Sequence, residues 1–106
     1  MNVKNYELVF DKVILRQIKK ASKNQQIKSI LTNILDKIEE LGPRAGSLLD
    51  SRLSLYELKV MHPPIRLYFK HDQSTNEIYI FEYEMKTSKE KQQDTINKLK
   101  DKISKP

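Results

Sequence analysis

The sequence predicts an α+β domain in which a small antiparallel sheet packs against helices on one face, in the order β-α-α-β-β-β-α. One sign of this class is an apolar stripe at helical spacing through residues 27–41. Another is a group of three strand-like segments, 55–61, 65–71 and 77–85, that follow one another with only short turns between them. Consecutive strands joined by hairpins pair antiparallel, and the helices then cover the sheet. We expect one such domain over residues 1–106.

The N-terminal half is predicted to hold one strand and two helices. Residues 5–10 have the alternation of a short strand, and Asp11 is placed to cap a helix that ends near Ala21. A second helix ends at Gly42-Pro43, because glycine favours a helix C-cap and proline cannot continue the helix. Residues 44–53 are predicted to be a loop or short turn. The stripe of the second helix, which we assign to core packing, consists of Ile27, Ile30, Leu31, Ile34, Leu35, Ile38 and Leu41.

A hairpin is predicted around a two-residue turn at Pro63-Pro64, where no ladder donor is needed. Its register turns the apolar residues of both strands toward the core and sets Glu57 opposite Lys70 as a cross-strand ion pair. In this register the only carboxylate near Arg66 on the two strands is that of Glu57, at a diagonal position. An aromatic side chain beside cations suits a stacked base and its phosphate. The outer face of this hairpin is expected to hold Glu57, Lys59, Arg66, Tyr68 and Lys70.

The C-terminal strand and helix are the last predicted elements. Ile78 and Ile80 indicate that the first half of strand 77–85 is buried on both sides, which favours a central position in the sheet. Thr87 and Glu90 have the spacing of a capping box, so a helix should begin there. Its stripe is thin, which predicts a helix that its own domain holds only loosely; the stripe consists of Ile96, Leu99 and Ile103.

Composition excludes several classes of protein. The chain has no cysteine and only two histidines, so a thiolate or zinc site is not expected. No apolar run approaches the ~18 residues of a membrane span, and the first ten residues are too polar for a signal peptide, so we expect a cytoplasmic protein without a membrane partner. The formal net charge of +6 favours acidic or phosphate-bearing partners.

The order of these elements, together with three local patterns, resembles the RelE/ParE superfamily of toxins, most closely its HigB-like branch. The patterns are LYELKV at 55–60, RLYF at 66–69, and a hydrophobic strand that ends in Lys86-Thr87 before a closing helix. The resemblance spans essentially the whole chain. Met85 and Glu84 depart from it: the family has a lysine at the position of Met85, and both residues weaken the positive charge at this rim.

The resemblance implies the toxin of a toxin–antitoxin pair, with a cognate antitoxin protein as partner. Most RelE-like members cut messenger RNA in the ribosomal A site without metal, so mRNA and the ribosome are implied partners and no cofactor is expected. RNA supplies its own nucleophile, the 2′-hydroxyl, and the protein must move protons and neutralise the phosphate. We assign catalysis to Glu57 or Lys59 as base, Arg66 as phosphate ligand, and Lys86 as acid or further charge. The expected RNA-binding residues are Tyr68, Tyr83, Lys70, Lys89 and Lys91.

Two other functions remain open for the same fold. Members of the ParE branch inhibit DNA gyrase, and a RelE-like chain with a decayed catalytic face would be a nucleic-acid- or antitoxin-binding regulator. Lys59 and Arg66 favour the ribonuclease, whereas Glu84 and Met85 favour the alternatives.

Overall fold

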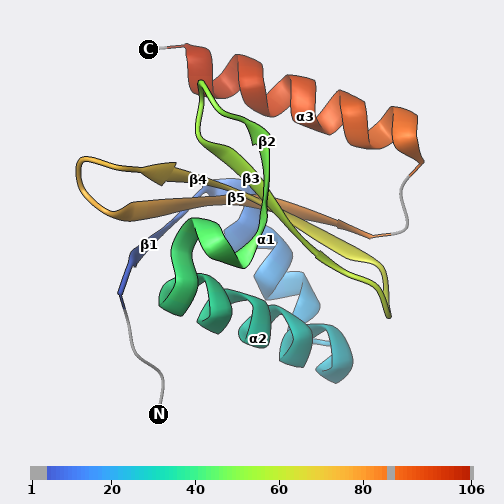
Figure 1. The fold of residues 1–106 in the computed structure, drawn as a ribbon. Helices are drawn as coiled ribbons and strands as arrows, with labels where there is room; N and C mark the ends of the chain where they lie inside the picture. Colours follow the sequence, from blue (N-terminus) through green and yellow to red (C-terminus); the bar gives the residue numbers. More distant parts are fainter. Residues whose placement is uncertain (1–4, 86–87, 106) are drawn as a thin grey trace.

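The computed structural model describes residues 5–85 and 88–105, so the expected roles of Lys86 and Thr87 lie outside the described residues. The chain forms a sheet flanked by helices (Figure 1). Its elements are β1 (Glu7–Phe10), α1 (Lys12–Ala21), α2 (Gln25–Leu41), a 3₁₀ turn (Gly42–Ala45), β2 (Ser47–Asp50), β3 (Leu55–Val60), β4 (Ile65–Asp72), β5 (Glu77–Met85) and α3 (Lys89–Ser104). The predicted α+β class is confirmed.

The sheet has five strands in the order β1-β5-β4-β3-β2, and it is mixed rather than antiparallel. Strands β2 to β5 are each antiparallel to the next, as expected of strands joined by short connections. β1 pairs parallel with β5, with Glu7 opposite Glu77 and Phe10 opposite Ile80. Among the described strands, β1 is separated from the next strand in sequence by two helices, whereas the other strands follow one another through short connections. A long connection of this kind permits parallel pairing. β5 therefore lies between β1 and β4, which confirms its predicted inner position.

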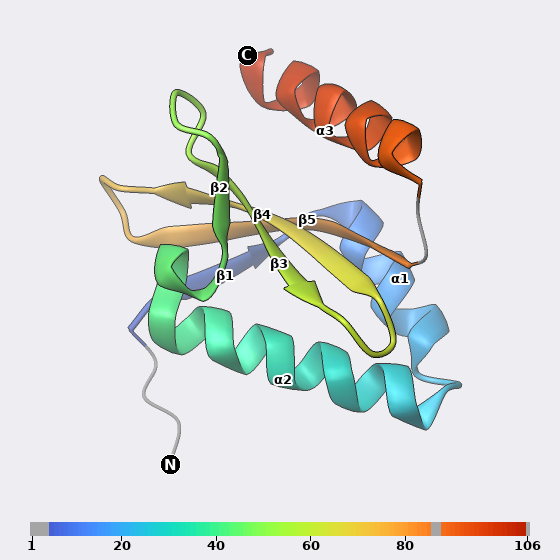
Figure 2. The same ribbon diagram turned by 45° about the vertical axis from the view of Figure 1, so that its right-hand side comes forward.

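Helices cover both faces of the sheet, not one as predicted. α1 and α2 lie on one face and α3 on the other (Figures 1 and 2). The core between the sheet and α1 and α2 contains the expected stripe of α2 together with Leu58, Ile65, Leu67 and Phe69 from the hairpin. The second, smaller core lies under α3 and consists of Leu55, Tyr68, Phe81 and Leu99, with Ile96 and Ile103 packed against it.

Both N-terminal helices begin at side-chain caps, of which the cap at Asp11 was predicted. The carboxylate of Asp11 accepts a hydrogen bond from the Val13 amide at 3.1 Å, and the Asn24 side chain accepts one from the Ile27 amide at 3.2 Å. Each cap satisfies an amide that the first helical turn leaves without a partner. Gly42 ends α2 with φ of 59°, a conformation that favours glycine.

The segment 44–53, predicted as a loop, contains the edge strand β2. Gly46 enters this strand where the backbone passes very close to β3: a Cβ on residue 46 would overlap the carbonyl group of Glu57 and press on the ring of Phe69. The φ of Gly46 is −133°, which any residue can adopt. The close approach to β3, and not the backbone conformation, therefore requires glycine here. A strand of four residues leaves only a weak signal in the sequence.

We expect Gly46→Ala to lower the free energy of unfolding by about 1–3 kcal/mol, because the overlap is with backbone and β2 must move away from β3. Chemical denaturation monitored by circular dichroism measures this difference. Ser47→Ala is the matched control, since Ser47 is exposed and its replacement should stay within about 0.5 kcal/mol. Equal stability of the two variants would contradict the close packing of β2 on β3.

A β-bulge in β5 changes which side chains face α3. Tyr68 lies opposite Glu82, whereas Phe69 lies opposite Ile80, so Phe81 is an extra residue in the ladder. Strict alternation would place Glu82 with Ile80 toward the core of α1 and α2. The bulge instead turns Glu82 toward α3, where it forms an ion pair with Lys98 at 3.3 Å.

α3 is held more firmly than its thin stripe predicted. It begins after Ser88, whose hydroxyl oxygen accepts a hydrogen bond from the Lys91 amide, and no capping box is formed by the described residues of this turn. Leu99 is 1% exposed. Polar contacts tie the helix to β5, β2 and the start of α1 through the pairs Thr95–Glu84 (2.8 Å), Lys98–Glu82 (3.3 Å), Lys100–Asp50 (3.5 Å) and Lys102–Asp11 (2.8 Å).

Two of these contacts depend on ionised aspartates. Burial alone would raise the pKa of Asp11, but hydrogen bonds from Lys102 and the Val13 amide together hold the pKa below its usual range. The Leu53 amide, followed by Lys100, holds the pKa of Asp50 below its usual range. A carboxyl whose folded-state pKa is depressed contributes stability above its unfolded pKa, and this stability is lost as pH falls through the folded value. Acid therefore weakens the attachment of α3.

Candidate nucleic-acid interface

The β3–β4 hairpin brings Lys59 and Arg66 directly opposite each other. The predicted assignment of faces is correct, but the predicted register is wrong by two residues, because the turn spans residues 61–64 rather than the two prolines alone. Val60 therefore lies opposite Ile65, and Leu55, not Glu57, lies opposite Lys70. A shift of two residues preserves the faces, since side chains alternate with a period of two.

Arg66 forms an ion pair with Glu57, the diagonal neighbour that the sequence indicated. Its Nη1 donates hydrogen bonds to both carboxylate oxygens of Glu57, each at 3.1 Å. The two side chains are only 23% and 14% exposed, so the pair is shielded from solvent more than a typical surface ion pair. The expected pair between Glu57 and Lys70 is not formed, because Lys70 lies opposite Leu55. Glu57 thus fixes the orientation of the guanidinium.

A hollow of about 240 Å³ lies beside this ion pair, at the N-terminal end of α3. It brings together the cations of the hairpin and residues of two other elements. Lys59 is exposed, while Arg66 is half-buried at its wall. The lining residues are Lys59, Val60, Met61, Pro64, Ile65, Arg66, Glu84 and Gln92. A guanidinium and an ammonium in one hollow are suited to bind the oxygens of a phosphate.

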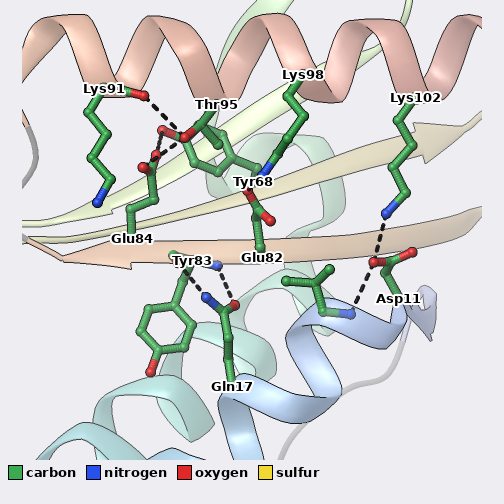
Figure 3. A network of polar contacts seen from close by, with 11 residues as sticks. Asp11, Gln17, Tyr68, Glu82, Tyr83, Glu84, Lys91, Thr95, Lys98 and Lys102 are labelled. Carbon is green, nitrogen blue, oxygen red and sulfur yellow. Dashed lines mark hydrogen bonds and ion pairs between the residues drawn. The ribbon is translucent and has the colours of Figure 1, made fainter.

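Tyr68 was expected on the open face, where it would stack on a base, and this expectation is wrong. Its side chain is 0% exposed, because α3 covers this part of the sheet. The Tyr68 hydroxyl donates to Glu84 at 2.8 Å, and the Thr95 hydroxyl donates to the other oxygen of the same carboxylate at 2.8 Å (Figure 3). Burial, followed by the hydrogen bond and charge of Glu84, raises the pKa of Tyr68. Tyr68 therefore anchors α3 to the sheet.

The remaining predicted RNA-binding residues do not gather at one place. Lys70 lies four residues along β4 from Arg66, about 13 Å at the rise of a strand, in a separate hollow near Lys102. Tyr83 and Lys91 line a third hollow across β5. Lys89 is exposed at the start of α3. Lys59, Arg66 and Glu57 are thus the predicted site residues that the structure brings together.

Glu84 and Gln92 are residues of this site that the sequence analysis did not assign to it. Glu84 reaches the α3 face only because of the bulge at Phe81, which alternation alone does not reveal. A signal was present, however: strict alternation would have placed two glutamates of β5 on the same face as Ile78 and Ile80. Burying two carboxylates in an apolar core is unfavourable, so a break in the alternation was to be expected.

Within residues 5–85 and 88–105, no group of three or more histidine, cysteine, aspartate or glutamate side chains is arranged to hold a metal ion. No helix among the described residues is long and apolar enough to cross a membrane.

Comparison with known proteins identifies the fold. No protein-family model matches the chain, and a comparison with curated protein sequences finds no significant match. Solved structures do match. The isolated RelE toxin of E. coli superposes with a TM-score of 0.65 at 17% identity, covering 89% of this chain and 98% of that chain. A chain of the intact E. coli RelBE toxin–antitoxin complex gives a TM-score of 0.63 at 18% identity, covering 78% of this chain and 99% of that chain.

A third match comes from another organism. The toxin–antitoxin complex RelBE2 of Mycobacterium tuberculosis gives a TM-score of 0.63 at 15% identity, covering 78% of this chain and 93% of that chain. The chain therefore has the fold of RelE-like toxins, as the resemblance of its local patterns predicted.

Proposed function

We propose that this chain is the toxin of a toxin–antitoxin pair and that it cleaves messenger RNA on the ribosome. The observation that carries the proposal is the placement of Lys59 directly opposite Arg66, in one hollow, on a RelE-like fold. The net charge of +6 supports a polyanionic substrate. The proposed activity takes place in the cytoplasm, where messenger RNA and ribosomes are found.

The proposed chemistry uses the 2′-hydroxyl of the RNA as nucleophile. Arg66 binds the non-bridging oxygens of the scissile phosphate and stabilises the charge that develops on them. Glu57 orients Arg66 through its two hydrogen bonds, and this contact makes it a positioning residue rather than the base. Lys59, exposed at the rim, is assigned charge neutralisation and proton transfer at the 2′-oxygen. Lys86 remains the proposed acid for the leaving 5′-oxygen.

The proposed protein partner is an antitoxin. Two structures of similar fold are described as toxin–antitoxin complexes. The net charge of +6 favours an acidic or amphipathic segment, docked in a groove. The thin apolar stripe of α3 is not available to this partner, because it packs on the sheet of its own chain.

Brief induction in a bacterial host tests the proposal. New messenger 5′ ends should appear within translated codons soon after induction, and co-expression of the neighbouring gene product should relieve growth inhibition. DNA supercoiling is assayed in the same cells. Relaxed or broken DNA without new ends would instead support a gyrase inhibitor, and neither change would support a nucleic-acid-binding regulator. Either of these results overturns the ribonuclease.

A further inference from the structure

The hollow lined by Tyr83 and Lys91, here called the second basic hollow, lies across β5 from the Arg66 site and has no part in the chemistry assigned above. Its volume is about 490 Å³, within the range of ligand sites. It is formed where α1, β5 and α3 meet, and Figure 3 shows Lys91, Thr95 and Lys98 of α3 on one side of β5 and Gln17 of α1 on the other. The lining residues are Gln17, Lys20, Glu82, Tyr83, Glu84, Met85, Lys91, Thr95 and Lys98.

The carboxylates that line this hollow have partners inside the protein, whereas two of its lysines have none among the described residues. Both carboxylates are engaged inside the protein: Glu82 pairs with Lys98, and Glu84 accepts from Tyr68 and Thr95. Within residues 5–85 and 88–105, the ammonium groups of Lys20 and Lys91 have no carboxylate within 4.0 Å and no hydrogen bond. Both of these lysines are exposed. Two ammonium groups with no carboxylate partner in the described part of the chain, beside carboxylates that are already paired, are suited to bind an anion.

The hollow also offers a half-buried aromatic ring. Tyr83 is packed against the core of α1 and α2 and also lines the hollow, and its ring lies on the side of β5 that faces away from α3 (Figure 3). Its neighbour Met85 is 40% exposed. A ring that is fixed by the core and still reachable from outside is suited to stack on a base, which every nucleotide offers. The combination of ammonium groups and such a ring fits a nucleotide better than a simple anion.

Gln17 argues against a peptide strand as the occupant. β1 ends opposite Ile80, so the outer edge of β5 beyond that residue lacks a strand neighbour among the described residues. Gln17 fills this place at Tyr83: its Nε2 donates to the Tyr83 carbonyl and its Oε1 accepts from the Tyr83 amide, both at 2.9 Å (Figure 3). A strand added here would need those same backbone groups. The occupant is therefore recognised by charge and stacking.

The position of the hollow connects it to the Arg66 site. Glu84 lines both hollows, and Gln92 of the first is adjacent in sequence to Lys91 of the second. We propose that this hollow binds a nucleotide of single-stranded RNA that flanks the segment held at Arg66, with Lys20 and Lys91 on its phosphates and Tyr83 stacked on its base. The proposal rests on the proposed function, because it takes the Arg66 site as the place where the strand is cut.

Direct binding tests this proposal without requiring cleavage. The probe is a fluorescein-labelled 2′-O-methyl RNA hexamer, which cannot be cut because its 2′-oxygen is blocked. Affinity for the purified chain is measured by anisotropy over a range of salt concentrations. The variant Lys20→Ala/Lys91→Ala should bind about tenfold or more weakly, and the slope of log K against log salt should fall by about 1.4, the value for two phosphate contacts on a single strand.

Matched variants separate the site from general charge. Lys12→Ala/Lys28→Ala removes two exposed lysines of α1 and α2 that do not line the hollow, and it should keep both the affinity and most of the salt slope. Tyr83→Leu should weaken binding by between about fivefold and about a hundredfold, the range for losing one stack, whereas Tyr83→Phe should retain it. Thermal melts of each variant confirm that it is folded.

The outcomes distinguish this site from the proposed function. Lysine-dependent binding of the hexamer supports the site even if induction yields no new messenger 5′ ends, in which case only the ribonuclease fails. The site is overturned if the hexamer does not bind, or if both lysine pairs weaken binding equally. It is also overturned if Lys20→Ala/Lys91→Ala affects a labelled glutamate decamer but not the hexamer, because the hollow would then receive an acidic protein segment.

Discussion

Arg66→Ala should reduce RNA cleavage by about a hundredfold or more while the protein remains folded. The guanidinium is placed beside Lys59 at the wall of the hollow, where it can bind the scissile phosphate. Loss of one donor to a transition-state oxyanion typically costs this much. Cleavage is measured by mapping messenger 5′ ends after brief induction, and growth inhibition should be lost in parallel. Arg66→Lys should recover only part of the activity, because an ammonium lacks the planar fork.

The ion pair with Glu57 changes the loss of stability that we expect from Arg66→Ala. A view of the hairpin from sequence alone predicts almost no cost, since Arg66 lies on the outer face. In the structure, however, its removal leaves the Glu57 carboxylate, 14% exposed, without its partner. The free energy of unfolding should therefore fall by about 1–3 kcal/mol. A toxic, folded Arg66→Ala protein would refute the proposed catalytic face and favour a gyrase inhibitor or a regulator.

Glu57→Gln separates positioning from proton transfer. If Glu57 only orients Arg66, the amide variant keeps one acceptor oxygen for the guanidinium and should retain part of the activity. If Glu57 is the base, the variant should be as inactive as Arg66→Ala. Lys28→Ala, an exposed change on α2, is the control for the positive charge that Arg66→Ala removes, and it should leave cleavage unchanged.

The faces of the hairpin were predictable, whereas its exact register was not. A slip by one residue would turn every apolar side chain of a strand outward, so the pattern fixes whether odd or even residues face the core. A slip by two residues leaves the faces intact and depends only on turn length. The turn spans residues 61–64, and the prolines in it did not reveal this length. The diagonal contact between Glu57 and Arg66 follows from the true register.

The second core explains why Tyr68 was misplaced. The outer face of the sheet was interpreted as polar because Lys59, Arg66 and Lys70 lie on it. That face also carries the apolar side chains of Leu55 and Phe81, which form a surface for an amphipathic helix. Sequence periodicity shows that α3 has an apolar stripe but does not show which face of the sheet receives it. The position of α3 had to come from the structure.

Leu99→Ala should lower the free energy of unfolding by about 2–5 kcal/mol, the usual cost of truncating a fully buried leucine. Leu99 is 1% exposed and fills the core under α3 with Leu55, Tyr68 and Phe81. Total stabilities of about 5–15 kcal/mol are typical of small domains, so this loss would be a large fraction. Denaturant unfolding measures the global effect, and amide hydrogen exchange across α3 measures the local one.

The control for this prediction is Asn97→Ala. Asn97 is exposed on the same helix, so its replacement should change stability by no more than about 0.5 kcal/mol. In the Leu99→Ala protein, faster exchange should be concentrated in α3, because its ion pairs with Asp11, Asp50 and Glu82 are exposed at their lysine ends and cannot replace the lost core. If Leu99→Ala is as stable as Asn97→Ala, α3 does not seal this face, and Tyr68 becomes available again to contact RNA beside Arg66.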